Sequence, residues 1–458
     1  MPKDLRSFLD DNAESILRVP GTVAREHLSA LIVQAARPVM FEAIDGFPGW
    51  RVLDLLFVDR RAQARVLDTE PDNVLACLAT ALDKPPVPTR PADAAPHRQN
   101  VLTGDEADLL ALPCFRHGGK DPAPALIAMN ICREPDGGAV NLSFTRMTPI
   151  GPRRATYLIG SSPHQRAILA AWEARGEAMP MACVIGTHPA YEIMASYSVP
   201  GHLAEFGELE MVGNLIGEPV ETVPCQTVPL EVPAHAEAVI EGWVQPGVRH
   251  DDGPGPSQAL YYLPGASPQP VMEVSAIAHR DRPILRQHNT LMFSDHQPLI
   301  GLPHEALLYT RLRADGHDVR ELFYVPWGGT LACVVQIVPK SDGEVRNVLM
   351  RTLGQRWPNA KLAIAIDADV DIGSSEDLVW SISTRVDPER DLFVVPEAKG
   401  HPIDPTARPA AGGPRDTVTG KWGIDATKPP VNRPDARAVF ERTLAPHIGE
   451  VRLEDFLD

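Results

Sequence analysis

Proline constrains this chain more than any other residue type. The sequence has 46 prolines in 458 residues, spread along its whole length. Because proline lacks a backbone N–H and fixes φ, it is largely excluded from helix interiors and central strands. The pattern therefore predicts many short helices and strands joined by turns. The densest group, between Lys84 and Pro96, predicts a surface connection.

Strand-like and helix-like segments alternate along the chain. Short apolar runs predict strands, and apolar residues at helical spacing predict helices. The expected strands are Val39–Glu42, Val140–Met147, Arg154–Ile159, Met181–Ile185, Ala332–Val338 and Lys361–Ile366. The expected helices are Asp4–Ile16, Arg60–Leu67, Pro163–Glu177, Pro189–Met194, a stretch near Glu305 and Gly343–Arg356. Such alternation is typical of a layered α/β (α+β) fold. After Asp391 the sequence predicts mostly loop, with a short helix at Ala436–Leu444.

Composition and charge exclude several classes of protein. The chain is long enough for two or three domains, and a hydrophobic content of 44% argues against disorder. A net charge of −17 argues against nucleic acid or anionic lipid as the main partner, because both attract clustered Lys and Arg. No apolar run approaches the roughly 20 residues of a membrane span. The start of the sequence has no apolar signal core, and the six cysteines are scattered, so a cytoplasmic location is expected.

The common nucleotide-binding and hydrolase motifs are missing from the sequence, but one spaced set of residues could bind a metal. Asn141 lies on an expected strand, His164 follows an expected hairpin, and Glu208 comes further on. An amide oxygen, an imidazole nitrogen and a carboxylate suit Mn²⁺ or Mg²⁺ better than structural zinc. Each residue alone also fits a structural role: Asn141 in a turn, His164 at a helix start, and Glu208 as one of several neighbouring glutamates.

Seven segments, in order, resemble the UbiD-like decarboxylases, which use prenylated flavin mononucleotide (prenylated FMN). They are Asn141–Arg146 followed by His164, Met181–Ala190, Glu208–Val220, Val232–Gly242, Asp367–Asp371, Val379–Arg385 and Lys421–Thr427. No single segment is decisive, but all of them in order make a chance match improbable. The resemblance extends over nearly the whole chain. It implies a flavin-binding domain around a β-barrel-like sheet with flanking helices, followed by a smaller α/β domain.

The resemblance also implies domain bounds. A prenylated-FMN-binding catalytic domain would occupy residues 1–303, with an α/β part at 1–120 and a split-barrel part at 121–303. A linker helix would follow at 304–325, and an α/β oligomerisation domain at 326–458 would form a homodimer or homohexamer. The loop Lys399–Pro430 of that domain would fold back toward the cofactor.

By position, the resemblance makes Asn141, His164 and Glu208 the ligands of a Mn²⁺ or Mg²⁺ ion that bridges to the flavin phosphate. Such an ion would neutralise a phosphate that an acidic chain would otherwise repel. Backbone around Ser196 would line the cofactor near a K⁺ site. Lys421 matches a lysine that reaches the cofactor, although an exposed loop lysine is an equally good interpretation of that residue.

Arg146 matches the arginine beside the reactive ring of the flavin, and its guanidinium suits a substrate carboxylate. The next catalytic segment departs from the family pattern. Asp252 replaces the first of two glutamates and can pair with Arg146 if the backbone moves closer. Ser257 replaces the second glutamate, the usual proton donor, although a hydroxyl is far too weak an acid for that role. Between them, the Gly255-Pro256 pair must give the loop a different path.

The proton therefore has several candidate sources. It could come from Asp252, from His288 or His296 in an unusually polar segment, or from a water held by Ser257. For His288 and His296 an exposed loop position is the simpler interpretation. The chain could also have lost decarboxylase activity and kept a binding or assembly role.

The leading prediction is a reversible, non-oxidative decarboxylase of an aromatic, heteroaromatic or α,β-unsaturated carboxylic acid. Arg146, Asp252 and Ser257 would be its catalytic residues, and a flavin prenyltransferase would supply the cofactor. The first alternative is a non-catalytic or partner-dependent subunit of a multi-component carboxylase. The second is an ordinary flavin binder similar to flavin reductases, which would carry unmodified flavin.

Overall fold

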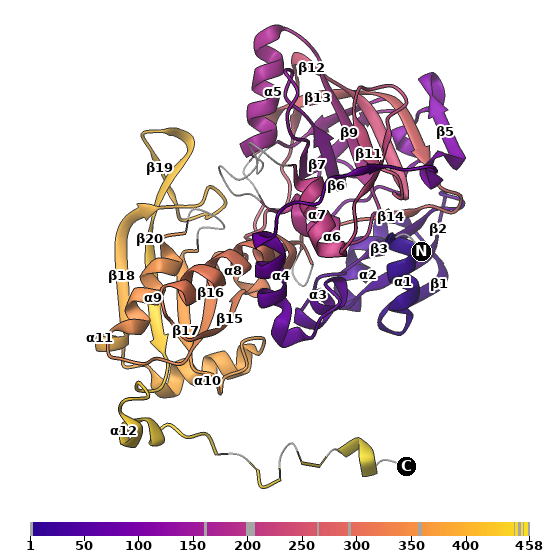
Figure 1. Ribbon diagram of the computed structural model, residues 1–458. Helices are drawn as coiled ribbons and strands as arrows, with labels where there is room; N and C mark the ends of the chain where they lie inside the picture. The colour runs from indigo at the N-terminus through magenta and orange to yellow at the C-terminus, as the bar shows by residue number, and fades with distance from the viewer. Residues whose placement is uncertain are drawn as a thin grey trace.

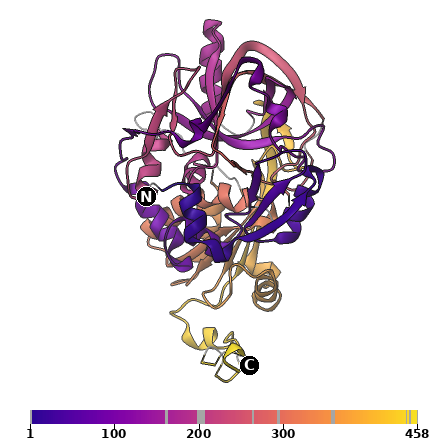
Figure 2. The ribbon, with the colours of Figure 1, turned by 90° about the vertical axis from the view of Figure 1, so that its right-hand side faces the viewer.

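The computed structural model describes residues 3–159, 163–197, 207–262, 265–291, 295–355, 360–443, 445–447, 450–451 and 453–456. Two lobes lie side by side with helices between them, and a C-terminal tail runs along the outside of the molecule (Figure 1). The view turned by 90° shows the tail projecting below both lobes (Figure 2). In the part of the chain described, no helix has the length and apolar character needed to cross a membrane.

The chain begins with a small sheet covered by helices. Its strands follow the order β1 (Leu17–Val23), β2 (Val39–Ile44), β3 (Arg51–Asp54) and β14 (Ile284–Arg286). The neighbouring helices are α1 (Leu5–Asp11), α2 (Leu28–Ala35), α3 (Arg60–Val66) and α4 (Val74–Asp83). Helix α1 starts at a capping box between Asp4 and Ser7 and ends at Asp11, earlier than expected. Strand β14 pairs with β3 although they are far apart in sequence, so residues after 286 lie beside this sheet.

Six strands close into a barrel, which confirms the expected β-barrel-like sheet. They are β6 (Leu126–Cys132), β7 (Asn141–Gly151), β8 (Arg154–Tyr157), β9 (Met179–Ile185), β12 (Ala238–Asp252) and β13 (Ser267–His279). The neighbour order is β12-β9-β6-β7-β8-β13, and β13 pairs back with β12 to complete the ring. All seven residues of β9 are buried, as its apolar run predicts. Strand β5 (Asn100–Thr103) adds to β13, and α5 (Pro163–Arg175) packs against β7, β9 and β12. A separate sheet joins β4 (Arg90–Pro91), β10 (Glu221–Pro224) and β11 (Glu231–Pro233).

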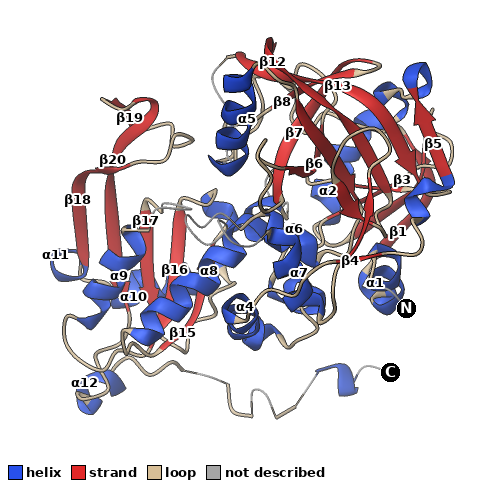
Figure 3. Ribbon diagram, turned by 45° about the horizontal axis from the view of Figure 1, so that its top comes forward, coloured by secondary structure: helices blue, strands red, loops and turns tan. Residues whose placement is uncertain are grey.

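Helices occupy the space between the barrel and the C-terminal lobe (Figure 3). Helix α4 packs against α7 (Glu208–Ile216) and α8 (His296–Ala314), and α6 (Ala190–Ala195) packs against the same two helices. The linker helix expected at 304–325 corresponds to α8, which begins at His296 and ends at Ala314, so both of its ends come earlier than predicted. Gly316, at a φ of 89°, follows its end, and Val319–Tyr324 then forms strand β15.

The C-terminal lobe is a mixed sheet in the order β15, β16 (Ala332–Ile337), β17 (Leu362–Ile366), β20 (Gly413–Ala426) and β18 (Leu392–Lys399). Strand β19 (Arg408–Ala410) pairs with β20. The helices of this lobe are α9 (Glu344–Leu353), α10 (Ser375–Arg385) and α11 (Pro388–Asp391), and α12 (Pro434–Ala438) follows the sheet.

The expected loop Lys399–Pro430 is wrong, because most of that segment is strand, and the expectation of mostly loop after Asp391 fails for residues 392–426, where β18, β19 and β20 lie. Strand β18 lies at the sheet edge with Val394 and Val395 partly exposed, and β20 carries polar Thr417, Thr419 and Lys421. Strand β20 therefore lacks the apolar run that marks a buried strand in sequence, whereas the short run Leu392–Val395 at the start of β18 is a strand signal that the prediction did not use. The terminal helix is also shorter than expected: α12 ends at Ala438.

Candidate active site

Two of the three expected metal ligands meet in the structure. Asn141 is the first residue of β7, and Glu208 is the first residue of α7. Asn141 Nδ2 donates to Glu208 Oε1 at 3.1 Å, and the Leu142 N–H donates to Glu208 Oε2 at 3.1 Å. Glu208 is 1% exposed, and this burial raises its pKa to about 8. A cation beside the carboxyl would favour its ionised form.

The third expected ligand, His164, lies on the helix that adjoins Asn141. It is half-buried in the first turn of α5. The next residue, Gln165, lies 3.2 Å through Oε1 from Ser143 Oγ, and Ser143 Oγ lies 3.3 Å from Asn141 Oδ1. The first turn of α5 thus reaches β7 beside Asn141. An amide, a carboxylate and a nearby imidazole fit a hard divalent cation, once the Asn141 amide turns its oxygen toward Glu208.

The expected set of metal ligands depends on the side-chain amide of Asn141. Within the described ranges, no three His, Cys, Asp or Glu side chains gather in an arrangement that could hold a metal ion. A site made only of those residue types is therefore not found there. The asparagine is the ligand that distinguishes the expected site from an ordinary acidic or histidine cluster.

Arg146 and Asp252 form the ion pair that the sequence suggests. Arg146 Nη2 donates to Asp252 Oδ1 at 2.7 Å, which joins β7 to the end of β12. The second carboxylate oxygen accepts hydrogen bonds from Thr148 Oγ1 at 3.0 Å and Thr156 Oγ1 at 2.8 Å. The two charged side chains are only 9% and 1% exposed. Water is thus largely excluded from a charge pair that is held in one geometry.

The loop after Asp252 passes directly beneath the guanidinium. A Cβ atom at Gly255 would stand 1.8 Å from Arg146 Nη1 and 2.8 Å from Arg146 Cζ. Arg146 therefore occupies the space that any other residue at position 255 would need. Two residues further on, Ser257 is buried, and its backbone N–H donates to Tyr261 O at 2.8 Å.

Buried polar atoms without a hydrogen-bond partner among the described residues occur on Arg146, on the loops before β6 and after β12, and on the segment that leads into α8. They are both ring nitrogens of His117, Asp121 Oδ1, Arg146 Nε, Ser257 Oγ, Thr290 Oγ1 and Asp295 Oδ1. A buried polar group left unpaired costs about 1–3 kcal/mol. A bound ligand or ordered water can complete the hydrogen bonds of such groups. The sequence analysis missed His117 and Asp121, and the only signal for them is a histidine and a carboxylate flanking the Gly118-Gly119 pair.

The two histidines suggested as proton donors are buried rather than exposed. The His288 ring makes an edge contact with Phe144 of β7 at 4.6 Å between centroids. His296 Nε2 lies 3.4 Å from Gln258 Nε2, which joins the start of α8 to the loop after Asp252. Burial lowers the pKa of His296 to about 4 and that of His288 well below its ordinary value. Both rings are thus neutral at pH 7 unless an anion binds beside them.

Arg286 anchors the segment that carries these histidines. Its guanidinium binds Glu192 at 2.9 and 3.0 Å, Asp295 at 2.6 Å and Asp54 at 3.4 Å. Burial raises the pKa of Glu192 to about 7, and burial and then Asp295 raise that of Asp54. This cluster ties β14 to α6, β3 and the start of α8. The sequence analysis missed it because its members lie far apart in the chain.

The remaining expected cofactor residues lie in two other places. Ser196 caps the end of α6, where its Oγ donates to Glu192 O at 3.0 Å. Lys421 is buried in β20 of the C-terminal lobe, and its ammonium donates to Leu353 O at 2.6 Å. Burial lowers the pKa of Lys421 to about 8. The structure therefore replaces the expected flexible loop lysine with a buried lysine on a strand.

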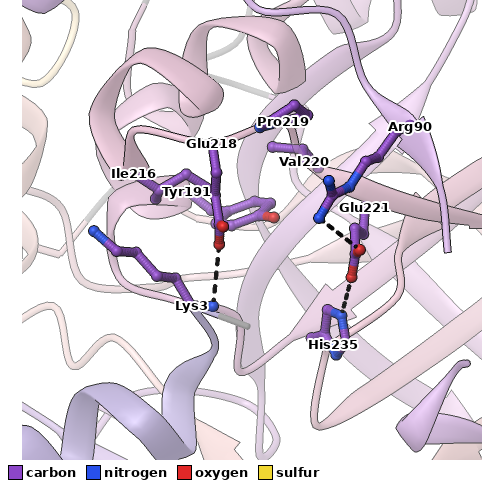
Figure 4. A pocket seen from close by; sticks show the side chains of 9 residues that line it. All are labelled: Lys3, Arg90, Tyr191, Ile216, Glu218, Pro219, Val220, Glu221 and His235. Carbon is purple, nitrogen blue, oxygen red and sulfur yellow. Dashed lines mark hydrogen bonds and ion pairs between the residues drawn. The ribbon is translucent and has the colours of Figure 1, made fainter. Parts of the chain in front are cut away.

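A second hollow lies at the opposite end of α7 from Glu208. Its lining residues are Lys3, Arg90, Tyr191, Ile216, Glu218, Pro219, Val220, Glu221 and His235. Figure 4 shows Arg90 and His235 both directed at Glu221, at 2.9 and 2.6 Å. The Lys3 backbone N–H faces Glu218 at 3.4 Å. The charges in this hollow thus pair with one another, and among the described residues the buried His235 Nδ1 is left without a hydrogen-bond partner.

Comparison with known proteins agrees with this geometry. The family model of the 3-octaprenyl-4-hydroxybenzoate carboxy-lyase Rift-related domain (UbiD) matches residues 89–292, and the model of the C-terminal domain of that carboxy-lyase matches residues 297–426. Anhydromevalonate phosphate decarboxylase of Methanothermobacter thermautotrophicus is 32% identical to this chain, over 70% of the chain and 74% of the relative.

Solved structures match along the whole chain. The UbiD-class enzyme HmfF from Pelotomaculum thermopropionicum in complex with FMN has a TM-score of 0.89 and 32% identity, covering 99% of this chain and 100% of that one. An evolved dimeric form of HmfF in complex with prFMN has a TM-score of 0.86 and 30% identity, covering 100% of both chains. Sedimentibacter hydroxybenzoicus vanillic acid decarboxylase in open form, with truncated ShVdcD, has a TM-score of 0.82 and 26% identity, covering 100% of this chain and 98% of that one. The closed barrel, the two matched domains and these relatives together show that the chain belongs to the UbiD family of decarboxylases and is a carboxy-lyase.

Proposed function

We propose that this chain catalyses the reversible, non-oxidative decarboxylation of an aromatic, heteroaromatic or α,β-unsaturated carboxylic acid with prenylated FMN and a divalent metal. The observation that carries the proposal is the buried Arg146–Asp252 pair, whose second carboxylate oxygen is fixed by two threonines. A related enzyme is described in complex with prFMN, which supports the choice of cofactor.

Arg146 binds the carboxylate that leaves. One of its terminal nitrogens is held by Asp252, and its Nε has no partner among the described residues and can donate to the substrate. The fork fixes the carboxylate, and burial excludes water from it, so the carbon–carbon bond is oriented before CO₂ departs. When bound, the modified flavin supplies the electron-poor ring that stabilises negative charge on the substrate carbon.

The cofactor would extend from Arg146 to the Asn141–Glu208 pair. Asn141, Glu208 and His164 would hold Mn²⁺ or Mg²⁺ against the flavin phosphate, since their donor atoms suit a hard cation. Backbone at Ser196 would line the cofactor beside a K⁺ ion. Lys421 would approach the phosphate from the C-terminal lobe, where its ammonium now binds a backbone carbonyl.

A water held by Ser257 would deliver the proton to the substrate carbon. Both oxygens of Asp252 already accept hydrogen bonds, and His288 and His296 are neutral, so none of the three is placed as a ready acid. Ser257 Oγ is buried without a partner, close in sequence to the glycine beneath Arg146. A hydroxyl is a poor acid but a good ligand for water.

The test uses protein made together with a flavin prenyltransferase, which would supply the cofactor. We expect modified flavin in the purified protein and CO₂ release from at least one aryl or acrylic acid. Arg146→Ala should abolish turnover while the melting temperature changes little. Undiminished turnover in that variant would remove Arg146 from the mechanism. Bound unmodified flavin, with no requirement for the prenyltransferase, would favour the ordinary flavin binder.

A second candidate is a subunit that needs a partner chain. The vanillic acid decarboxylase structure is described with a second component, ShVdcD, and the usual proton-donor position holds Ser257 in this chain. The two candidates differ in the behaviour of the isolated chain. Exchange of deuterium or labelled CO₂ into an acid by the purified protein alone supports the complete enzyme, whether homodimer or homohexamer. Exchange that appears only with an added partner supports the subunit.

A further inference from the structure

Two buried threonines face the carboxylate that pairs with Arg146. Thr148 on β7 and Thr156 on β8 lie directly opposite each other in the ladder between these strands. Thr148 Oγ1 donates to Asp252 Oδ2 at 3.0 Å, and Thr156 Oγ1 donates to the same oxygen at 2.8 Å. Thr148, Thr156 and Asp252 are 4%, 0% and 4% exposed. The two hydroxyls therefore meet one carboxylate oxygen in a place that water scarcely reaches.

Arg146 projects from the same face of the sheet as the threonines. Arg146 and Thr148 are two residues apart on β7, so their side chains share one face. Thr156 is directly opposite Thr148, which places its side chain on that face as well. Arg146 Nη2 binds Asp252 Oδ1 at 2.7 Å, while both hydroxyls bind Oδ2. The carboxylate is thus held at three points, which fix its plane as well as its position.

The main chain at Asp252 is fixed by contacts of its own. Asp252 is the last residue of β12 and pairs with Ser267 of β13. Gly253 follows at a φ of 108°, and a Cβ there would stand 2.8 Å from Gly265 O. The strand pairing before the turn and the close approach within it leave the backbone little room to shift. The side-chain contacts must therefore place the carboxylate.

The length of the side chain matters for these contacts. The resemblance puts a glutamate at this position, and Asp252 is one methylene shorter. In the structure the shorter side chain reaches Arg146 and both hydroxyls at once. An extended glutamate from the same Cα would carry its carboxylate roughly 1.5 Å further, which hydrogen bonds of this length do not tolerate. The threonine pair therefore matches the length of an aspartate.

We propose that Thr148 and Thr156 are positioning residues for the decarboxylation: they hold the short carboxylate of Asp252 so that Arg146 faces the substrate in one orientation. This inference rests on the proposed function and adds two residues to it. Arg146 touches the substrate, whereas the threonines act only through Asp252. Hydrogen bonds to a carboxylate are stronger than those between neutral groups, so both hydroxyls stiffen the pair. A loosened guanidinium still attracts the substrate but orients it poorly, which lowers the rate more than the affinity.

The test replaces each hydroxyl with a methyl group. Thr148→Val and Thr156→Val keep the branched side chain that suits a strand and remove one donor each. With the cofactor-loaded protein we expect kcat to fall by at least about ten-fold in each variant, while KM stays within about three-fold, because the charge of Arg146 remains. Thr156→Ser keeps the hydroxyl and should restore kcat to within about three-fold of the wild type.

Thr222→Val is the matched control. Thr222 is a buried threonine on β10 that donates to Glu231 Oε2 at 2.9 Å, in a sheet separate from the barrel. Its replacement removes the same kind of hydrogen bond and should leave kcat unchanged. A fall in kcat that appears equally in Thr222→Val, or that Thr156→Ser does not restore, overturns the positioning role.

A double-mutant cycle shows whether the threonines act through Asp252. Asp252→Glu should lower kcat by at least about ten-fold, because its carboxylate no longer fits the hydroxyls. In that background Thr156→Val should cost less than about three-fold, since the contact that it removes is already lost. An equal loss from Thr156→Val in both backgrounds overturns the proposal, and so does full kcat in Asp252→Glu.

The proposed function can fail separately from this inference. If the wild type releases no CO₂ from any aryl or acrylic acid, the crystal structure of the double variant Thr148→Val/Thr156→Val decides the inference. A displacement of the Arg146 guanidinium by about 1 Å or more supports it, and an unmoved Arg146–Asp252 pair overturns it. Turnover by the wild type with unchanged kinetics in both valine variants would keep the proposed function and reject the positioning role.

Discussion

Gly255→Ala tests how Arg146 is held in place. The added Cβ would stand 1.8 Å from Arg146 Nη1, whereas carbon and nitrogen atoms in ordinary contact lie at roughly 3.5 Å. The guanidinium must therefore move by about 1.5 Å or more, which is enough to break its 2.7 Å hydrogen bond to Asp252. Since a displacement of about 1 Å can cost 100-fold in rate, we expect kcat/KM to fall at least that far.

The fold should survive this substitution. Loss of one charge-assisted hydrogen bond costs about 1.5–3 kcal/mol, and Gly255 does not have a positive φ that would add backbone strain. Flavin content should stay unchanged, because Asn141 and Glu208 are not touched. The assay is CO₂ release with thermal melting and flavin absorbance alongside. Gly151→Ala is the control, since a Cβ on that residue of β7 meets nothing within 4 Å. Wild-type kcat/KM in Gly255→Ala would refute the idea that the glycine positions the arginine.

Four further outcomes are expected. Asp252→Asn should lower kcat by about 100-fold or more, because the fork of the arginine loses its charged partner; unchanged CO₂ release would show that the loop supplies no working carboxylate. Glu208→Gln should lower the metal and flavin content measured by elemental analysis and absorbance, whereas Glu218→Gln at the far end of α7 should not; equal losses would argue against a metal site at Glu208. Ser257→Ala should slow turnover less than Asp252→Asn, because a water can remain without the hydroxyl; the reverse order would contradict this prediction. His117→Phe should reduce the loss of folding stability in acid. The pKa of His117 is 6.5 in the unfolded chain and about 3 in the folded chain, so between these pH values the unfolded chain binds a proton that the folded chain does not. The free energy of unfolding of the wild type should therefore fall by about 2 kcal/mol when the pH is lowered to 5. If the urea midpoint falls equally from pH 7.5 to pH 5 in the wild type and in His117→Phe, this ring does not determine the stability in acid.

Local pattern and family resemblance together predicted the centre of the molecule. The apolar run of β9 is fully buried, and the expected barrel closes through β12 and β13. Asn141 and Glu208 lie in contact although 67 residues separate them. Arg146 and Asp252 pair as expected, because the closed barrel brings the end of β12 close to the middle of β7. Residue identity at matched positions was sufficient for these contacts.

The features that sequence could not predict depend on partners supplied by tertiary structure. Strand β18 lies at the sheet edge and β20 carries polar residues, and their pairing with each other and with β17 makes them strands. Lys421 thereby moved from a predicted loop into a buried sheet. His288 and His296 were interpreted as exposed because their segment is polar, whereas Arg286 and three carboxylates bury that segment. His117 has no sequence neighbour that signals its role.

The ladder between β12 and β13 has a consequence for how this enzyme can be altered. It runs from Ala238 paired with His279 to Asp252 paired with Ser267, and both strands belong to the closed ring. The hairpin tip that contains Gly255 and Ser257 grows from the far end of this ladder, where Arg249–Asp252 pair with Ser267–Pro270 beyond the pairings of β12 with β9 and of β13 with β8. Replacing that tip with the tip of a relative that has a different acid would leave the pairings between the barrel strands unchanged. The tip can therefore be exchanged as a unit to alter substrate preference.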